Sequence, residues 1–458
     1  MPASAETVTT SAQPRPPWRR RLGAAGVVVA LAAALTAGAI VIGGTGGQPA
    51  AATRTTAADA PLERIADGDL ASGIAALQTH LRTQPKDAVS WATLGAAYVE
   101  QARTTGDPTR YPQAEEAFDR SMTIQRKDND AALAGRAALA AARHDFPAAL
   151  RNAESALTIN AYNERALAVR IDALVELGRY DAAFRAARHA DSIRPGIPIF
   201  TRYAYVLELR GDPKGARRVL LDALGSAVSP GDIAYVTTAL GQLAWSQGDY
   251  TTALKQYAEA LRVSPSYLPA LDGRGRTYAA RGELADAARD LAEVVRRYPL
   301  PAQLAALGEV YEAQGDRKRA KQQYGVVGTW IALARANGVA TDLDTALVAA
   351  DHGDREEALR AARAEWQRRH SVHTADALAW ALHVNGHDHE ALTYAKYAAA
   401  PGYRSALFLY HRGMIERALG HRTAARTSLI AALKLNPGFS PTASQAARTA
   451  LHALGGAK

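Results

Sequence analysis

The chain of 458 residues carries a formal net charge of +9, contains no cysteine, and has 48% hydrophobic but only 7% aromatic residues. The absence of cysteine excludes structural disulfides, thiolate nucleophiles and a lipid-modified cysteine. Abundant alanine, leucine and arginine, with few aromatic residues to alternate in strands, favour an all-α fold.

The first 43 residues form two segments of opposite character. Residues 1–21 contain several prolines and end in Trp18-Arg19-Arg20-Arg21, which is typical of a disordered basic tail. Residues 22–43 contain no charged residue. As a helix this segment would be about 33 Å long, enough to cross a bilayer. The sequence therefore predicts a single transmembrane helix at 22–43.

The charges that flank this segment predict its orientation. Four arginines outweigh Glu6 on its N-terminal side, which leaves +3, and the opposite flank is nearly neutral. The positive-inside rule then places the tail in the cytoplasm and the rest of the chain outside. We favour an uncleaved anchor in the cytoplasmic membrane, because the apolar run exceeds the roughly 7–15 residues of a signal core. The alternative is a signal peptide cleaved near Ala50-Ala51-Ala52 and a secreted protein.

Residues 44–61 connect this segment to the rest of the chain. They are rich in glycine, alanine and threonine and have little to pack into a core. A flexible coil of this length has a root-mean-square span of roughly 20–25 Å. The predicted linker would keep the remaining chain close to the membrane but free to tilt.

From residue 62 to the end, short turns recur at nearly constant spacing. The second residue after each turn glycine, or its equivalent, defines eleven anchors: Leu70, Tyr111, Phe146, Tyr180, Pro213, Tyr250, Leu284, Arg317, Arg355, Asp388 and Arg422. Nine of the ten intervals lie between 33 and 38 residues, and one is 41. Such a period indicates a solenoid, in which each unit buries its apolar face on its neighbours.

A single unit, Asp232 to Pro265, explains the repeat. Apolar and small residues recur at spacings of three and four, as on one face of an amphipathic helix. Gly248 ends the first helix with a left-handed residue, and Pro265 stops the second helix. Small residues such as Gly241 let the two helices approach closely. Each unit is therefore predicted to be a helical hairpin.

These residues resemble the tetratricopeptide repeat (TPR) family over about 62–458. The first unit carries the family's W-x-x-L-G-x-x-Y run as Trp91, Leu94, Gly95 and Tyr98. The interval of 41 residues between the anchors Leu70 and Tyr111 indicates a polar loop at Gln101–Arg110. The resemblance implies a right-handed α-solenoid of about ten to eleven helix-turn-helix repeats.

Two later segments depart from the repeat. Residues 325–343 do not fit it, because the second helix of that unit is predicted to run on through Trp330 and Ala334. The following Ala340–Asp344 is similar to a segment in a subset of bacterial repeat proteins, for which we know of no assigned activity. After Ser440, a lone helix at 441–454 is predicted to cap the end of the stack.

In this family, ligands commonly lie in the concave groove lined by the first helices. The corresponding polar and aromatic positions here are Asp172, Tyr205, Glu208, Gln242, Trp245, Arg276, Glu309 and Glu312. Earlier units carry mostly alanine at these positions. We expect a groove for an extended peptide or helix of a partner, centred on Tyr205, Trp245 and Arg276. The alternative is that the aromatic side chains pack against the neighbouring first helix.

Basic and histidine-rich runs are the remaining candidate sites. Removing the +3 tail leaves +6, which is weak for a nucleic-acid-binding protein, so no nucleic acid is expected. Pairs such as Arg296-Arg297 and Arg368-Arg369 are interpreted as solvated faces of second helices; the alternative is attraction to anionic membrane or wall polymers. Segment 370–389 contains several histidines, but part of it lies at an exposed repeat turn, and we expect no metal there.

The sequence contains no motif of a known catalytic site and no separate domain to house one. No enzyme activity and no cofactor are therefore expected. Two functions remain: a membrane-tethered scaffold that binds protein or peptide partners, or an extracytoplasmic carrier that holds exported peptides or polysaccharide as a chaperone would. The partner, the biological process and the oligomeric state are not defined by the sequence.

Overall fold

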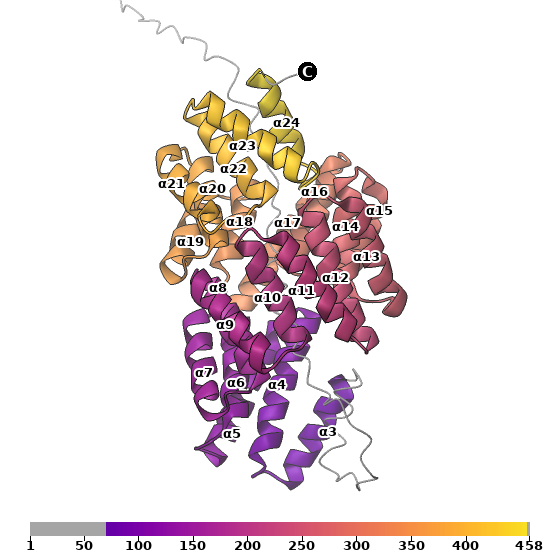
Figure 1. Cartoon of the computed structure of the whole chain (residues 1–458), viewed down its shortest axis with the longest axis vertical. Helices are drawn as coiled ribbons and strands as arrows, with labels where there is room; N and C mark the ends of the chain where they lie inside the picture. The colour runs from indigo at the N-terminus through magenta and orange to yellow at the C-terminus, as the bar shows by residue number, and fades with distance from the viewer. Residues whose placement is uncertain (1–69, 456–458) are drawn as a thin grey trace, which may run out of the picture.

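The computed structural model describes residues 70–455, which form a continuous series of helical hairpins without any strand in that range. Ten hairpins follow one another between a single leading helix, α3 (Leu70–Thr83), and a single final helix, α24 (Ala443–Ala453). Consecutive helices pack against each other throughout. Figure 1 shows α3 and α24 at opposite ends of the molecule. The predicted all-α solenoid is confirmed for this part of the chain.

We number the hairpins as repeats 1 to 10. Their first helices are α4 (Ala88–Thr105), α6 (Asp130–Ala142), α8 (Glu164–Glu176), α10 (Ile197–Leu209), α12 (Pro230–Ser246), α14 (Leu268–Ala280), α16 (Pro301–Ala313), α18 (Asp342–His352), α20 (Val372–Val384) and α22 (Ala406–Ala418). Their second helices are α5 (Tyr111–Ile124), α7 (Phe146–Ile159), α9 (Tyr180–Ile193), α11 (Pro213–Ser226), α13 (Tyr250–Val263), α15 (Leu284–Arg297), α17 (Arg317–Ala336), α19 (Arg355–Arg368), α21 (Asp388–Ala399) and α23 (Arg422–Leu435).

The predicted repeat register agrees with these bounds. Each of the eleven anchors is the first residue of a helix: α3 begins at Leu70, and the other ten anchors begin the ten second helices. The long helix predicted through Trp330 and Ala334 is α17, of 20 residues. The loop predicted at 101–110 is wrong in part, because α4 continues to Thr105 and residues 108–110 form the short helix η2 (Pro108–Arg110). The final helix begins at Ala443, two residues later than predicted.

Large side chains of the second helices fill the space between neighbouring first helices. The Phe118 ring lies against Gly95 and Gly135, where an added Cβ would overlap it, and Tyr257 occupies the same place between Gly241 and Gly273. Both rings are fully buried. Glycine is needed at these positions because the ring takes the space of a side chain.

Contacts between distant repeats close the solenoid on itself. The turn between the two helices of each of repeats 1 to 5 meets a loop about five repeats later in the chain. In repeat 1, Gly106 lies against Leu300, and in repeat 2 the Arg143 carbonyl accepts a hydrogen bond from the Ala340 amide at 3.0 Å. In repeat 4, Gly211 lies against the Gly402 carbonyl. We call this series of contacts the seam.

The seam is strongest at repeats 3 and 5. The Tyr180 hydroxyl accepts a hydrogen bond from the Val372 amide at 2.7 Å. The Tyr250 hydroxyl donates to Asn436 Oδ1 at 2.5 Å, and Asn436 Nδ2 donates to the Trp245 carbonyl at 2.8 Å. Asn436 is 1% exposed. These hydrogen bonds join residues that are 186 to 192 positions apart in the chain.

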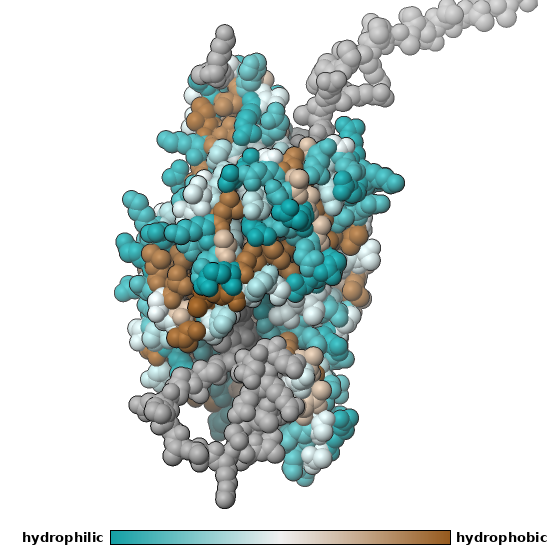
Figure 2. Space-filling model, turned by 90° about the vertical axis from the view of Figure 1, so that its right-hand side faces the viewer, coloured by the Kyte–Doolittle hydropathy of each residue, from teal (hydrophilic) through white to brown (hydrophobic). Residues whose placement is uncertain are grey.

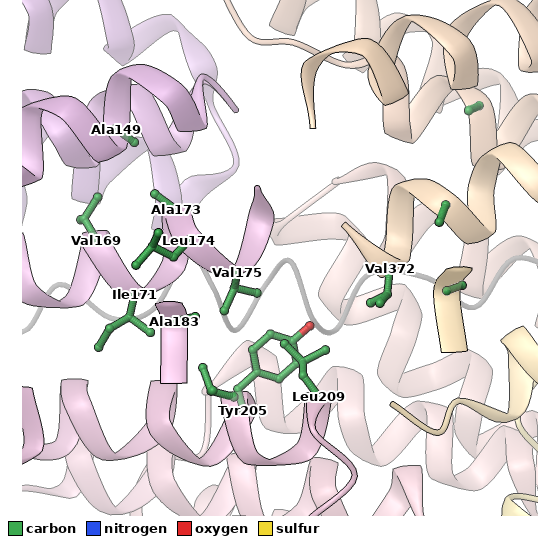
Figure 3. Packing of buried hydrophobic residues seen from close by; sticks show 14 of the residues in the cluster. Ala149, Val169, Ile171, Ala173, Leu174, Val175, Ala183, Tyr205, Leu209 and Val372 are labelled. Carbon is green, nitrogen blue, oxygen red and sulfur yellow. The ribbon is translucent and has the colours of Figure 1, made fainter. Parts of the chain in front are cut away.

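Packing of apolar side chains crosses the seam as well. One buried cluster contains residues of α3 to α10 together with residues of α18 to α24. Figure 3 shows Val372 facing Val175, Tyr205 and Leu209 from the opposite side of the seam. Figure 1 shows the same arrangement at the level of helices, with α8 beside α19 and α20. The first and last repeats therefore share a core, whereas the middle repeats have separate smaller clusters.

No helix within residues 70–455 has the length and apolar character needed to cross a membrane. The predicted tail, transmembrane helix and linker at 1–61 lie outside the described residues. Those three assignments remain predictions.

Candidate functional site

The eight residues predicted to line a groove all lie on first helices, from α8 to α16, and face the inside of the closed solenoid. Six of them, Asp172, Tyr205, Gln242, Trp245, Arg276 and Glu309, are at most 9% exposed, and Glu208 and Glu312 are half-buried. An open groove would leave such side chains in solvent. The structure instead places them on an enclosed surface, which we call the inner surface.

Two of the charged residues are paired within the chain. Asp172 accepts a hydrogen bond from Arg202 Nε at 2.9 Å, and both side chains are buried. Arg276 donates to Asp272 at 3.1 Å and to the Ala302 carbonyl at 3.1 Å. The guanidinium expected to bind a partner's carboxylate therefore already has acceptors in its own and the next repeat.

The two predicted aromatic anchors are buried in different parts of the core: Tyr205 lies in the cluster that crosses the seam, and Trp245 lies in a smaller cluster with side chains of α13 and α14. The pKa of Tyr205 is raised, first by burial and then by the nearby Tyr403. The Trp245 carbonyl accepts from Asn436. The Tyr205 hydroxyl and Trp245 Nε1 are buried with no hydrogen-bond partner among the described residues. Both rings thus lie inside the protein and keep an unused donor there.

Four carboxyl groups gather further along the inner surface, on α16, α18 and α20. Glu309 accepts from Ser440 at 3.0 Å, Asp351 accepts from Trp380 Nε1 at 2.7 Å, and Asp376 pairs with His411 at 2.9 Å. Burial raises the pKa of both Glu309 and Asp351, and each of the two also feels a neighbouring acid. The fourth, Glu312, is half-buried, and burial raises its pKa too.

One member of this cluster, Asp351, lines a cavity of about 1160 Å³ at the C-terminal end of the solenoid. Its walls are the turn between α14 and α15, the ends of α18 and α20, and the facing sides of α22 and α24. Asp351, Trp380 and Tyr410 form its floor, and four exposed arginines surround it: Arg281, Arg355, Arg417 and Arg448. The volume lies slightly above the roughly 300–1,000 Å³ of typical small-molecule pockets.

The outer surface differs from the inner one. On the side shown in Figure 2, the surface is mainly hydrophilic, and hydrophobic residues form separate patches between charged ones. Arg296 and Arg297 are exposed or half-exposed and pair with Glu293. Arg369 contradicts the interpretation of its run as a solvated face: it is 6% exposed and pairs with Glu365 and, across the seam, with Glu176.

Comparison with known families finds a tetratricopeptide repeat at residues 237–267, which cover most of α12 and all of α13. The other nine hairpins have the same architecture and register. The protein is a tetratricopeptide repeat protein. No curated protein sequence matches the chain.

Several solved TPR structures are similar to this one. PilW, a type IV pilus biogenesis factor, is 23% identical, with 44% of this chain and 92% of PilW covered and a TM-score of 0.37. TTC0263, a thermophilic TPR protein of Thermus thermophilus, is 24% identical over 41% of this chain and 97% of its own, with a TM-score of 0.36. The human IFIT1 dimer with PPP-AAAA is 14% identical over 82% and 89%, with a TM-score of 0.45.

The histidine-rich segment of this TPR protein is divided among different surroundings. His383 bonds Asp388 at 2.5 Å, and His370 stacks on Trp366 with a centroid separation of 4.3 Å. Burial lowers the pKa of His373. Within residues 70–455, no group of three or more histidine or acidic side chains has the geometry to hold a metal ion.

Sequence reasoning missed Asp351, Trp380 and Tyr410, which form the cavity floor. Trp380 lies eight residues before the start of α21, as Tyr205 does before α11 and Arg276 before α15. The rule that selected the groove residues would therefore have selected Trp380, had it been applied to the later repeats. Tyr410, twelve residues before the start of α23, also lies at a position that the rule covers, whereas Asp351 lies at a position outside it. Only the three-dimensional structure brings the three side chains together.

Proposed function

We propose that this TPR protein is a membrane-tethered interaction scaffold that binds a segment of a partner protein on its inner surface, entered through the C-terminal cavity. A TPR solenoid commonly binds protein partners, and none of the described residues forms a recognisable catalytic arrangement. The proposal includes the transmembrane anchor at 22–43, with the repeats on the outer side of the cytoplasmic membrane.

The observation that carries the proposal is the set of unused polar groups on the inner surface. The side chains of Tyr205, Trp245, Glu309 and Tyr410 each bury a donor or acceptor without a partner among the described residues. An unpaired buried polar group costs roughly 1–3 kcal/mol. In the free protein, ordered water would satisfy these groups. A bound segment would displace this water and form the hydrogen bonds itself.

Site-specific photo-crosslinking tests this function in the full chain. A photoreactive residue at Met414, which lines the cavity, should give one defined crosslinked protein in the native host. The same residue at Val228, which is 89% exposed outside the cavity, serves as the matched control. Equal products at both positions, or none at Met414, would contradict binding at the cavity.

The alternative function, an extracytoplasmic carrier, predicts a different outcome. A carrier would crosslink to many unfolded exported chains, whereas a scaffold would give a fixed stoichiometric product. Membrane fractionation and N-terminal sequencing of the mature protein distinguish the anchor from a cleaved signal peptide. Retention of residues 1–43 in the membrane fraction is the expected result.

A further inference from the structure

We infer that the C-terminal cavity is a subsite for one lysine or arginine side chain of the bound protein segment, with its cation held at the Asp351 carboxylate beside the Tyr410 hydroxyl. This inference rests on the proposed function and adds the chemistry that the partner segment must carry.

The first argument is that the turn of repeat 6 is only partly covered: Gly438 lies against the Ala280 backbone, but nothing lies against Gly282 two residues later. A Cβ added at the turn glycines Gly178, Gly211 or Gly248 would strike the backbone of the facing loop. The corresponding Gly282 of repeat 6 has nothing within 4 Å of its added Cβ, and it lines the cavity. In the earlier repeats this space is filled by an extended loop of the same chain, so an extended segment fits here.

The second argument is the floor of the cavity, which offers hydrogen-bond acceptors. Asp351 uses one oxygen, Oδ1, to accept from Trp380 Nε1. Tyr410 is fully buried, and its hydroxyl has no hydrogen-bond partner among residues 70–455. The Trp380 ring stacks on His411 at 4.2 Å and lies 4.9 Å from His383, so Trp380 serves to position Asp351. A carboxylate beside a hydroxyl oxygen that can accept is a favourable site for an ammonium or guanidinium group.

The third argument is the charge around Asp351. The carboxyl groups of Glu312 and Asp376 disfavour the ionised form of Asp351, and Asp351 has the same effect on Glu309. His411 already pairs with Asp376, and His383 with Asp388. Burial and these acids together raise the pKa of Asp351 well above its ordinary value. A bound cation would compensate the acids and allow Asp351 to ionise.

The rim limits how many positive charges the segment can carry. Arg281, Arg355, Arg417 and Arg448 are all exposed at the cavity edge. They would repel a run of basic residues and favour acidic residues next to the bound side chain. The segment that fits best therefore has a single lysine or arginine flanked by aspartate or glutamate.

A matched set of synthetic peptides tests the inference. Four peptides of equal length with identical acidic flanks carry lysine, arginine, norleucine or glutamate at the centre. We expect the lysine and arginine peptides to bind the full-length protein at least tenfold more tightly than the norleucine peptide. Asp351→Asn should reduce this preference to threefold or less, because it keeps the acceptor for Trp380 but cannot ionise. Glu356→Gln, an equal charge change on the exposed face of α19, should leave the preference unchanged.

Proton release gives a second measurement that a merely structural role of Asp351 would not change. Binding of the lysine peptide at neutral pH should release a proton from Asp351, so the calorimetric enthalpy should depend on the ionisation enthalpy of the buffer. Asp351→Asn should abolish this dependence on the buffer. Tyr410→Phe should weaken binding about threefold but leave the dependence on the buffer unchanged. The second variant covers the case in which Asp351→Asn does not fold.

The outcomes separate the two proposals. Equal binding of the lysine and norleucine peptides would overturn the cation subsite and leave the scaffold function standing. Failure of every peptide to bind, with no crosslink at Met414, would overturn both. A crosslink from Met414 to residues 1–69 of the same chain, or to a second copy, would show that another occupant fills the cavity and would also overturn the subsite.

Discussion

The turns of repeats 3 and 6 have nearly the same backbone and very different surroundings. Gly178 has φ 73° and Gly282 has φ 80°, and each ends its first helix in the left-handed conformation. Gly178 lies against the His370 carbonyl, whereas Gly282 faces the cavity. The local sequence determines the shape of each turn. What covers the turn depends on whether a loop five repeats later exists to meet it.

This comparison separates a structural part of the inner surface from a part available for binding. Across repeats 1 to 5, the seam contacts hold the solenoid closed, and Asp172 is paired within the chain, whereas the Tyr205 hydroxyl and Trp245 Nε1 have no partner among residues 70–455. At repeat 6 only the end of α14 is covered, where Gly438 lies against Ala280, and the neighbouring Gly282 lines the cavity together with Asp351. Substitutions at the seam contacts should therefore affect stability, and substitutions in the cavity should affect binding.

The largest effect is expected from Arg369→Ala. Arg369 is buried and shared by Glu365 in its own repeat and Glu176 across the seam. Removing one partner of a buried ion pair typically costs about 3–5 kcal/mol. Arg297→Ala, which removes a largely solvated arginine of α15, should cost less than about 1 kcal/mol. Urea unfolding compares the two variants, and equal losses would show that the seam contributes no more than a surface ion pair.

The paired substitutions Gly178→Ala and Gly282→Ala test the comparison most directly. An alanine at either site costs roughly 1–2 kcal/mol for the left-handed conformation. At Gly178 the new methyl group also meets the His370 backbone, which adds about 1–3 kcal/mol of overpacking. We expect a total loss of about 3 kcal/mol at Gly178 and about 1 kcal/mol at Gly282, measured by thermal unfolding. A larger loss at Gly282 would contradict the open surroundings of that turn.

Tyr250→Phe should loosen the last contact of the seam. It deletes the hydroxyl that donates to Asn436 and accepts from the Gly438 amide at 2.8 Å, with an expected loss of about 2 kcal/mol. Hydrogen exchange of the Gly438 amide should accelerate. Tyr111→Phe is the control, since Tyr111 holds the same repeat position without a hydroxyl hydrogen bond among residues 70–455. Unchanged exchange at Gly438 would count against the seam as a closing contact.

The smallest effect is a pH dependence from Glu208. Burial raises the pKa of Glu208 from 4.5 to about 7, although the side chain accepts from Ser246 at 2.9 Å. Between these two pKa values the folded protein holds a proton that the unfolded chain releases, so stability falls as the pH rises from one value to the other. Glu208→Gln should therefore stabilise the protein by about 1 kcal/mol at a pH of about 8 and leave it unchanged at a pH of about 4. Equal effects at both pH values would argue against a raised pKa.

The sequence predicted the helices well because their determinants are local. Anchors such as Tyr180 and Tyr250 mark the first residue of a second helix, and the long α17 was expected from its uninterrupted pattern. The region at 101–110 was misjudged because its polar residues are compatible with both a loop and an exposed helix, and α4 uses them to extend by a turn.

The site was predicted less well because it depends on the pitch of the solenoid. The first-helix rule found the inner surface, including Tyr205, Trp245 and Arg276, but placed them in an open groove. Small rotations between neighbouring repeats accumulate over five repeats before the seam forms, and no local pattern encodes their sum. For the same reason Arg369, which looks like a surface residue at the end of α19, could not be recognised as a buried contact.

The seam also restricts how this protein can change its length in evolution or by design. An open solenoid can gain or lose a unit, because each unit touches only its neighbours. Here the turn of repeat 3 must face His370 and that of repeat 5 must face Asn436. Deleting one hairpin between them, for example α14 with α15, would shift every later loop past its turn. The number of hairpins between a turn and the loop that faces it is therefore fixed by the geometry of the closed solenoid.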